Sequence, residues 1–163
     1  MITFLLFLKR IFFRFVYLMS IKTRIKINDI TQLSDNYFSL LRYDFSYHRN
    51  DGTWQDQMRE VYDCGDGAAI LLYNLQNRTI ILIKQLRLPA YLNGHDDLLF
   101  EVPAGLLDEA HPETRIIAET EEETGYRISH VQKIMEAFVS PGAVKQKLHL
   151  FIGEYSASNK VSQ

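Results

Sequence analysis

The chain has 163 residues, of which 47% are hydrophobic and 23% charged, the composition of one globular domain with a sizeable core. Its net charge of −2 at pH 7 argues against a general nucleic-acid-binding protein, which would carry a basic surface. A single cysteine excludes a disulfide within the chain and favours a reducing, cytoplasmic location.

The first 18 residues are almost entirely apolar, but cations at positions 9, 10 and 14 interrupt them. Central cations are costly in a membrane-spanning helix, and a signal peptide carries its cations before the apolar run. The pattern favours a native start at Met19, with residues 1–18 as a non-native extension and residues 19–163 as the domain. The alternative is an interfacial anchor, since the cations at positions 10 and 14 share one helix face.

Strand-like sequence begins at Ile25. Aromatic and bulky residues over Tyr37–Tyr47 predict one strand, and Gln55–Tyr62 predicts its return. Between them, Arg49–Gly52 carries the Asp-Gly signal of a tight turn. These features predict an N-terminal β-hairpin.

The remainder predicts more strands around one helix. Cys64–Gly67 is expected to be a loop in which the glycines serve turn geometry, because a strand rather than a helix follows it. Further strands are expected at 68–73, 79–88, 98–102, 131–138 and 147–155, with a polar loop at 89–97. The helix is expected from Pro112 to Thr124, because proline suits its first turn and Gly125 the position after its end. This order predicts an α+β fold.

Acidic residues gather near the end of the predicted helix. Glu119, Glu122 and Glu123 stand at i, i+3 and i+4 and crowd one helix face, where each like-charge pair costs about 0.2–0.5 kcal/mol. The C-terminal half of a helix also favours cations rather than anions. Stability gives no reason for the cluster, so it predicts a site for a divalent cation such as Mg²⁺, which prefers oxygen ligands. A solvated acidic face is the plainer alternative.

The residues around this cluster resemble the Nudix box, which has a glycine, then a glutamate, then Arg-Glu-U-x-Glu-Glu-x-Gly-U with U aliphatic. The matching stretch runs from Gly105 to Tyr126. Glu101–Gly105 resembles the lead-in of Nudix enzymes that cut ADP-ribose and nucleotide sugars. More narrowly, residues 20–156 resemble the GDP-mannose pyrophosphatase subfamily, through the segments 33–38, 59–63, 67–74, 104–108 and 140–142.

The resemblance implies a Nudix α/β/α sandwich with an N-terminal β-hairpin extension. It implies hydrolysis of a nucleotide-sugar diphosphate, GDP-mannose to GMP and mannose 1-phosphate, with Mg²⁺ or Mn²⁺ as cofactor. It also implies a homodimer in which the N-terminal hairpin crosses to the partner protomer.

The resemblance assigns roles by motif position. Glu119, Glu123 and the Ala104 carbonyl are the implied metal ligands, and Glu122 is a further ligand or a carboxylate behind them. Arg87 is expected to hold substrate phosphate, because the arginine fork suits phosphate. The expected contacts to nucleotide or sugar are Tyr37, Arg59 and Glu60. For Tyr37 and Arg59, ordinary surface positions on a strand are the alternative.

The chain departs from the family pattern. His111 stands in place of the first box glutamate, and Ala118 in place of the box arginine or lysine. Gln146 falls at an expected catalytic position where the subfamily has a glutamate, and an amide orients water but takes no proton near neutral pH. The chain ends at Gln163, so we expect a truncated domain without the closing helix and with an exposed apolar sheet face.

Three other functions stay open at the level of the sequence. ADP-ribose pyrophosphatase is the alternative enzyme, because the Glu101–Gly105 lead-in fits both substrates. A non-catalytic remnant is favoured by Gln146 and opposed by the intact set of glutamates. A membrane-surface interaction protein would rest on residues 1–18 alone.

Overall fold

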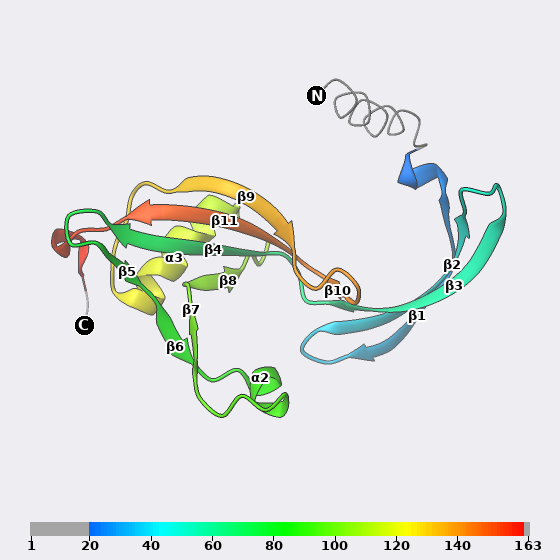
Figure 1. Cartoon of the computed structure of the whole chain (residues 1–163), viewed down its shortest axis with the longest axis horizontal. Coiled ribbons are helices and arrows are strands. Elements are labelled where there is room, and N and C mark those ends of the chain that lie inside the picture. The colour runs from blue at the N-terminus through cyan, green and yellow to red at the C-terminus, as the bar shows by residue number, and fades with distance from the viewer. Residues whose placement is uncertain (1–19, 162–163) are drawn as a thin grey trace, which may run out of the picture. The chain divides into compact units, whose positions relative to one another are not determined.

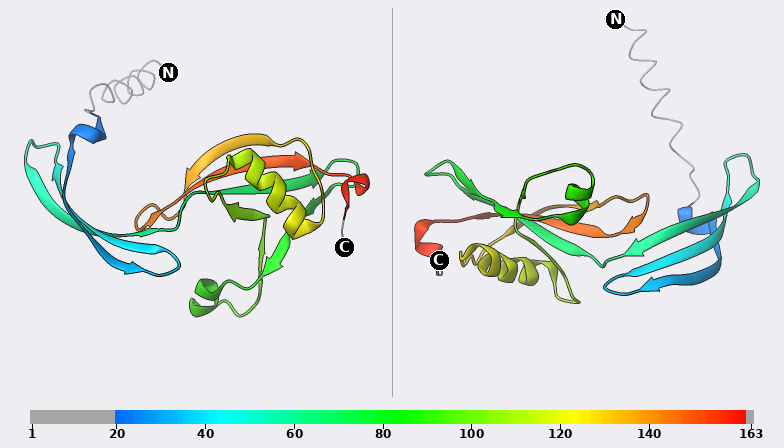
Figure 2. Two further views of the ribbon diagram at one scale, coloured as in Figure 1. Left: turned by 180° about the vertical axis from the view of Figure 1, so that it is seen from behind. Right: turned by 90° about the horizontal axis from the view of Figure 1, so that it is seen from below.

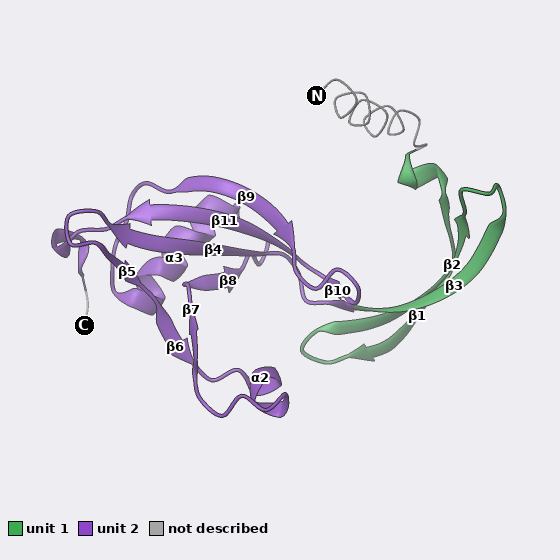
Figure 3. Ribbon diagram, viewed as in Figure 1, with its two compact units in different colours: residues 1–61 green, residues 62–163 purple. Residues whose placement is uncertain are grey.

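The computed structural model describes residues 20–161 (Figure 1). The chain folds into two compact units, Met1–Val61 and Tyr62–Gln163 (Figure 3). The predicted N-terminal extension at 1–18 lies outside the described residues. None of the helices within residues 20–161 is long and apolar enough to cross a membrane.

The first unit is an antiparallel sheet that follows a short 3₁₀ helix, η2 (Ile21–Thr23). β1 (Ile25–Asp35) pairs with β2 (Ser39–His48) through a ladder with two register shifts. β3 (Trp54–Asp63) lies on the other side of β2. The predicted hairpin is therefore confirmed, with β1 as an additional strand along its edge.

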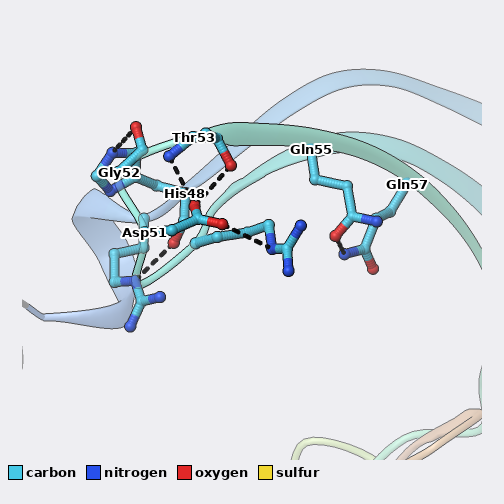
Figure 4. Close-up of polar contacts among 8 residues, drawn as sticks. His48, Asp51, Gly52, Thr53, Gln55 and Gln57 are labelled. Atoms are coloured by element: carbon cyan, nitrogen blue, oxygen red, sulfur yellow. Dashed lines mark hydrogen bonds and ion pairs between the residues drawn. The ribbon is translucent and has the colours of Figure 1, made fainter.

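The turn between β2 and β3 forms where the Asp-Gly signal predicts it (Figure 4). The Gly52 N–H donates to the Arg49 carbonyl at 3.1 Å, and Gly52 has a φ of 84°, which glycine adopts without strain. Asp51 Oδ1 accepts from the Thr53 hydroxyl at 2.6 Å and from the Thr53 N–H at 3.0 Å. These hydrogen bonds lower the pKa of the Asp51 carboxyl and hold the turn closed.

The second unit is built around β4 (Gly67–Asn74), which runs parallel to β11 (Lys147–Glu154). On its other side β4 pairs antiparallel with β5 (Thr79–Ile81) and β8 (Ala104–Leu106). β9 (Gln132–Phe138) pairs antiparallel with β11 and completes the order β5-β4-β11-β9. The predicted strands for β4, β9 and β11 are confirmed to within two residues at each end.

Smaller elements complete the second unit. β6 (Ile83–Gln85) and β7 (Leu99–Glu101) form a separate antiparallel pair, and the segment between them contains a short helix, α2 (Leu88–Leu92). β10 (Val144–Lys145) runs parallel to the last two residues of β3, which belong to this unit. A 3₁₀ helix, η3 (Ala157–Asn159), follows β11.

Two predictions for this region were wrong. The strand expected at 79–88 is two strands, because β5 pairs with β4 whereas β6 pairs with β7, and the chain changes partner at Leu82. The loop expected at 89–97 begins inside α2, where Pro89 occupies the first helical turn. An apolar run does not show where a strand changes its partner.

The helix α3 (Pro112–Thr124) has the predicted bounds. Gly125 follows it in the left-handed conformation with a φ of 72°, and its N–H donates to the Glu121 carbonyl at 2.9 Å. The helix lies against one face of the β4–β11 sheet (Figures 1 and 2) and buries Ile116 completely. The other buried residues of this core are Ala68, Ile70, Leu72, Ile128 and Phe151. Mostly strands with few helices, the architecture confirms the α+β prediction.

Candidate active site

The acidic face of α3 lies beside the start of β8. The Glu119 side chain is buried, with 7% of its residue surface exposed, whereas Glu122 and Glu123 are exposed. Glu123 Oε2 accepts a hydrogen bond from the backbone N–H of Ala104 at 3.1 Å. The packing of α3 therefore places the predicted ligands Glu123 and Ala104 together, although 19 residues separate them in the chain.

Gly105 allows the Glu119 carboxylate to approach the backbone of β8. A Cβ at position 105 would lie 2.7 Å from Glu119 Cγ and closer still to the carboxylate group. Only a residue without a side chain leaves this room. Gly105, the first residue of the Nudix-like box, thus leaves the space that the buried Glu119 side chain occupies.

Both carboxyl groups have a pKa above its ordinary value. Burial is the main cause at each; at Glu119 the Arg115 guanidinium opposes it, and at Glu123 the Ala104 N–H opposes it. The Glu119 carboxylate raises the pKa of Glu123 further. Although the Glu123 residue as a whole is exposed, its carboxylate lies against Ala104 and loses contact with water there. A cation placed between two such carboxylates would relieve their repulsion.

Arg115 lies one helical turn before Glu119 and joins the helix to β8. Its guanidinium forms an ion pair with Glu119 Oε1, and its Nε donates to the Leu106 carbonyl at 3.0 Å. The two side chains of the ion pair are 28% and 9% exposed. Arg115 was not predicted from the sequence, because the box has its cation at position 118. Its i, i+4 spacing from Glu119 was the available signal.

Arg87, the predicted phosphate ligand, is bound by Glu101 of β7. Arg87 Nε lies 2.9 and 3.1 Å from the two carboxylate oxygens, and one terminal nitrogen lies 2.8 Å from Oε2. Gln85 donates to the same carboxylate at 2.8 Å. The hydrogen bond to Glu101 is the main cause that raises the pKa of Arg87, and Glu123 adds to it. Arg87 therefore lies in the electrostatic field of Glu123, and its own partner Glu101 had no role predicted from the sequence.

Gln146 lies immediately before β11, near the start of β4, where Gly67 pairs with Leu106 of β8. A Cβ at Gly67 would lie 3.1 Å from the Gly105 carbonyl oxygen and 3.9 Å from Gln146 Nε2. The side-chain amide is therefore in the neighbourhood of Gly105, the residue against which Glu119 packs. Its catalytic role stays a prediction.

The three predicted contacts to nucleotide or sugar lie in the first unit, outside this cluster. Tyr37 is 85% exposed, and its ring meets that of Phe38 edge-on with centroids 4.5 Å apart. Arg59 donates to the Met58 carbonyl at 2.6 Å, and Glu60 is exposed. Their contact with substrate stays a prediction.

In the described part of the chain, no group of three or more His, Cys, Asp or Glu side chains is arranged to hold a metal ion. The set predicted from the sequence is of a different kind, since it consists of two carboxylates and the Ala104 carbonyl. All three donors are oxygens, and the carboxylates repel each other across one helix face. This donor chemistry fits a hard divalent cation that completes its coordination with water and phosphate.

Comparison with known proteins agrees with the family resemblance of the sequence. A family model described as the GDP-mannose pyrophosphatase NudK N-terminal domain matches residues 24–62. A GDP-mannose pyrophosphatase of Yersinia enterocolitica is 49% identical over 141 residues, which are 85% of this chain and 74% of the relative. The GDP-mannose pyrophosphatase of Yersinia pestis is 47% identical over 80% of this chain, and that of Pectobacterium atrosepticum is 49% identical over 77% of it. Each match spans 66% of the relative.

Among solved structures, the crystal structure of an ADP compounds hydrolase matches with a TM-score of 0.61 at 13% identity. The match covers 80% of this chain and 67% of that one. The two chains therefore share a fold. With the identities above, the chain belongs to the GDP-mannose pyrophosphatase family.

Proposed function

We propose that the chain hydrolyses the diphosphate linkage of a nucleotide sugar, converting GDP-mannose and water to GMP and mannose 1-phosphate. The observation that carries the proposal is the pair Glu119 and Glu123 beside the backbone of Ala104, in a chain 49% identical to a GDP-mannose pyrophosphatase. Helix stability disfavours carboxylates at these two positions, so binding of a divalent cation is the better explanation for them.

The proposed cofactor is Mg²⁺, with Mn²⁺ as a substitute. Glu119, Glu123 and the Ala104 carbonyl would hold it, with Glu122 as a further ligand or a carboxylate behind them. A cation in this place supplies charge neutralisation for the diphosphate and activation of a water molecule. The protein contributes a buried, fixed Glu119 and a Glu123 oriented by the Ala104 N–H.

Substrate contacts are proposed for the residues predicted from the sequence. Arg87 would bind a phosphate oxygen with its fork and share its guanidinium between that oxygen and Glu101. Tyr37 offers an exposed ring for stacking on a base, and Arg59 and Glu60 would contact the nucleotide or the sugar.

Gln146 limits the proposed turnover. Its amide lies near Gly105 and could orient the attacking water, but it cannot take the proton of that water. We therefore expect substrate to bind well and to be cleaved slowly.

A homodimer with exchanged N-terminal hairpins is also proposed. In the first unit, β1 exposes large apolar side chains, a surface that a partner protomer would cover. These side chains are Ile25, Ile27, Ile30 and Leu33. Light scattering of the purified chain tests this state. The proposed cytoplasmic location rests on the single cysteine.

The proposed activity is tested by phosphate release from a panel of nucleotide sugars and ADP-ribose with Mg²⁺, with a phosphatase acting on the monophosphate products. We expect release to be fastest from GDP-mannose and to stop with EDTA, Glu119→Gln or Glu123→Gln. Glu121→Gln is the matched control, because Glu121 lies on the same helix and pairs with Arg127 instead. Faster release from ADP-ribose would favour the alternative enzyme. Binding without release from any compound would favour the non-catalytic remnant.

A further inference from the structure

Arg115 makes two contacts that the box pattern does not account for. Its guanidinium pairs with Glu119 Oε1 on its own helix and, through Nε, donates to the Leu106 carbonyl of β8 at 3.0 Å. One planar fork thus joins the buried carboxylate to the strand against which that carboxylate packs. With 28% of its side chain exposed, Arg115 holds this position largely shielded from water.

Helix stability gives little reason for an arginine at this position. Arg115 is the fourth residue of α3, in the half of the helix where anions rather than cations are favoured. An arginine four residues before a glutamate is also the less favourable order of an i, i+4 pair. The contacts with Glu119 and β8 are therefore the better explanation for Arg115.

Position 118, directly before Glu119, holds an alanine, whereas the Nudix box has a cation there. We propose that Arg115 replaces this missing cation as a positioning residue, which fixes the Glu119 carboxylate against β8 and serves as its counter-ion in the metal-free protein. The kinetic part of this inference rests on the proposed function, and the stability part does not.

The counter-ion role has a consequence for metal-free protein. Arg115→Ala leaves a buried Glu119 carboxylate without its partner, which is more costly than losing an exposed ion pair. We expect Arg115→Ala to lower Tm in EDTA by roughly 4 °C or more for a chain of this size. Mg²⁺ should then raise Tm more in this variant than in the wild type, because the cation takes over the role of the counter-ion.

The positioning role has a separate, kinetic consequence. Arg115→Ala should lower kcat for GDP-mannose by on the order of 10- to 100-fold while KM changes little, because a displaced Glu119 acts on the reaction rather than on sugar binding. Arg115→Lys keeps the charge but loses the planar fork that spans two acceptors. We expect this variant to keep the metal-free Tm and to lose kcat, which separates positioning from charge.

Two further variants make the experiment decisive. Ala118→Arg, added to Arg115→Ala, should restore both the metal-free Tm and kcat if a cation at either position serves Glu119. Arg127→Ala is the matched control, since it breaks an exposed pair with Glu121 on the same helix and should leave kcat and the Mg²⁺-induced rise in Tm unchanged. Wild-type Tm and kcat in Arg115→Ala, or no rescue by Ala118→Arg, would overturn the proposal. If the wild type cleaves no nucleotide sugar, the proposed function fails, and the Tm series alone decides the role of Arg115.

Discussion

Gly105→Ala tests how tightly the Glu119 carboxylate is seated. The added Cβ would lie 2.7 Å from Glu119 Cγ, and real Cβ atoms essentially never come within 3.0 Å of a neighbour. The carboxylate itself would be closer, so the whole end of the side chain must move. Glu119 has little room for this, because it is 7% exposed and paired with Arg115.

The size of the effect follows from this geometry. Overpacking of a close contact costs about 1–3 kcal/mol. At about 2–4 °C per kcal/mol for a chain of this size, Tm should fall by about 2–12 °C. A metal ligand displaced by about 1 Å should also lower kcat by on the order of 10²-fold. The Mg²⁺-induced rise in Tm should shrink as well, because the variant binds the cation more weakly.

The assay is thermal unfolding of Gly105→Ala in EDTA and in millimolar Mg²⁺, followed by the phosphate-release assay. Gly142→Ala is the control, since a Cβ at position 142 meets nothing within 4 Å. The control should keep the wild-type Tm in both buffers. If Gly105→Ala also keeps the wild-type Tm and the full Mg²⁺-induced rise in Tm, then Glu119 does not pack against Gly105 of β8 and the reasoning is refuted.

Three further predictions concern single carboxyl or amide groups. Glu119→Gln or Glu123→Gln should lower kcat by at least about 10²-fold in the phosphate-release assay, and turnover that survives EDTA would contradict the metal site. Gln146→Glu should raise kcat by up to about 10²-fold with little change in KM; a flat kcat would place the base elsewhere. Two lysines lower the pKa of Glu136 to about 2 from 4.5, so its stabilising effect is present above pH 4.5 and is lost as pH falls toward 2. Glu136→Gln should therefore remove part of the drop in Tm across that range, and an unchanged acid profile would argue against these contacts.

Local signals in the sequence determined several elements. Pro112 and Gly125 fixed both ends of α3, because a proline suits the first helical turn and glycine alone adopts the left-handed cap without strain. The Asp-Gly pair fixed the turn at Arg49–Gly52 for the same conformational reason. Helical periodicity likewise put Glu119 and Glu123 on one face before any contact was known.

Only the tertiary structure decided where strands change partners. The run at 79–88 is apolar from Ile80 to Ile83, and nothing local marks the break at Leu82 between β5 and β6. The break exists because β4 pairs with the residues before Leu82, whereas β7 pairs with the residues after it. Periodicity reports which face a residue occupies, and it does not report which strand that face will meet.

The site divides in the same way. The sequence predicted the acidic helix of the site. Two contacts depend instead on how α3, β7 and β8 pack: Ala104 with Glu123, 19 positions apart in the chain, and Arg87 with Glu101, 14 positions apart. Arg115 is intermediate: its spacing from Glu119 is local, whereas its bond to Leu106 needs β8 in place. Side-chain patterns fix neighbours within about one helical turn. The packing of α3 beside β8 brings Glu123 to Ala104, and the pairing of β6 with β7 brings the segment of Arg87 to Glu101.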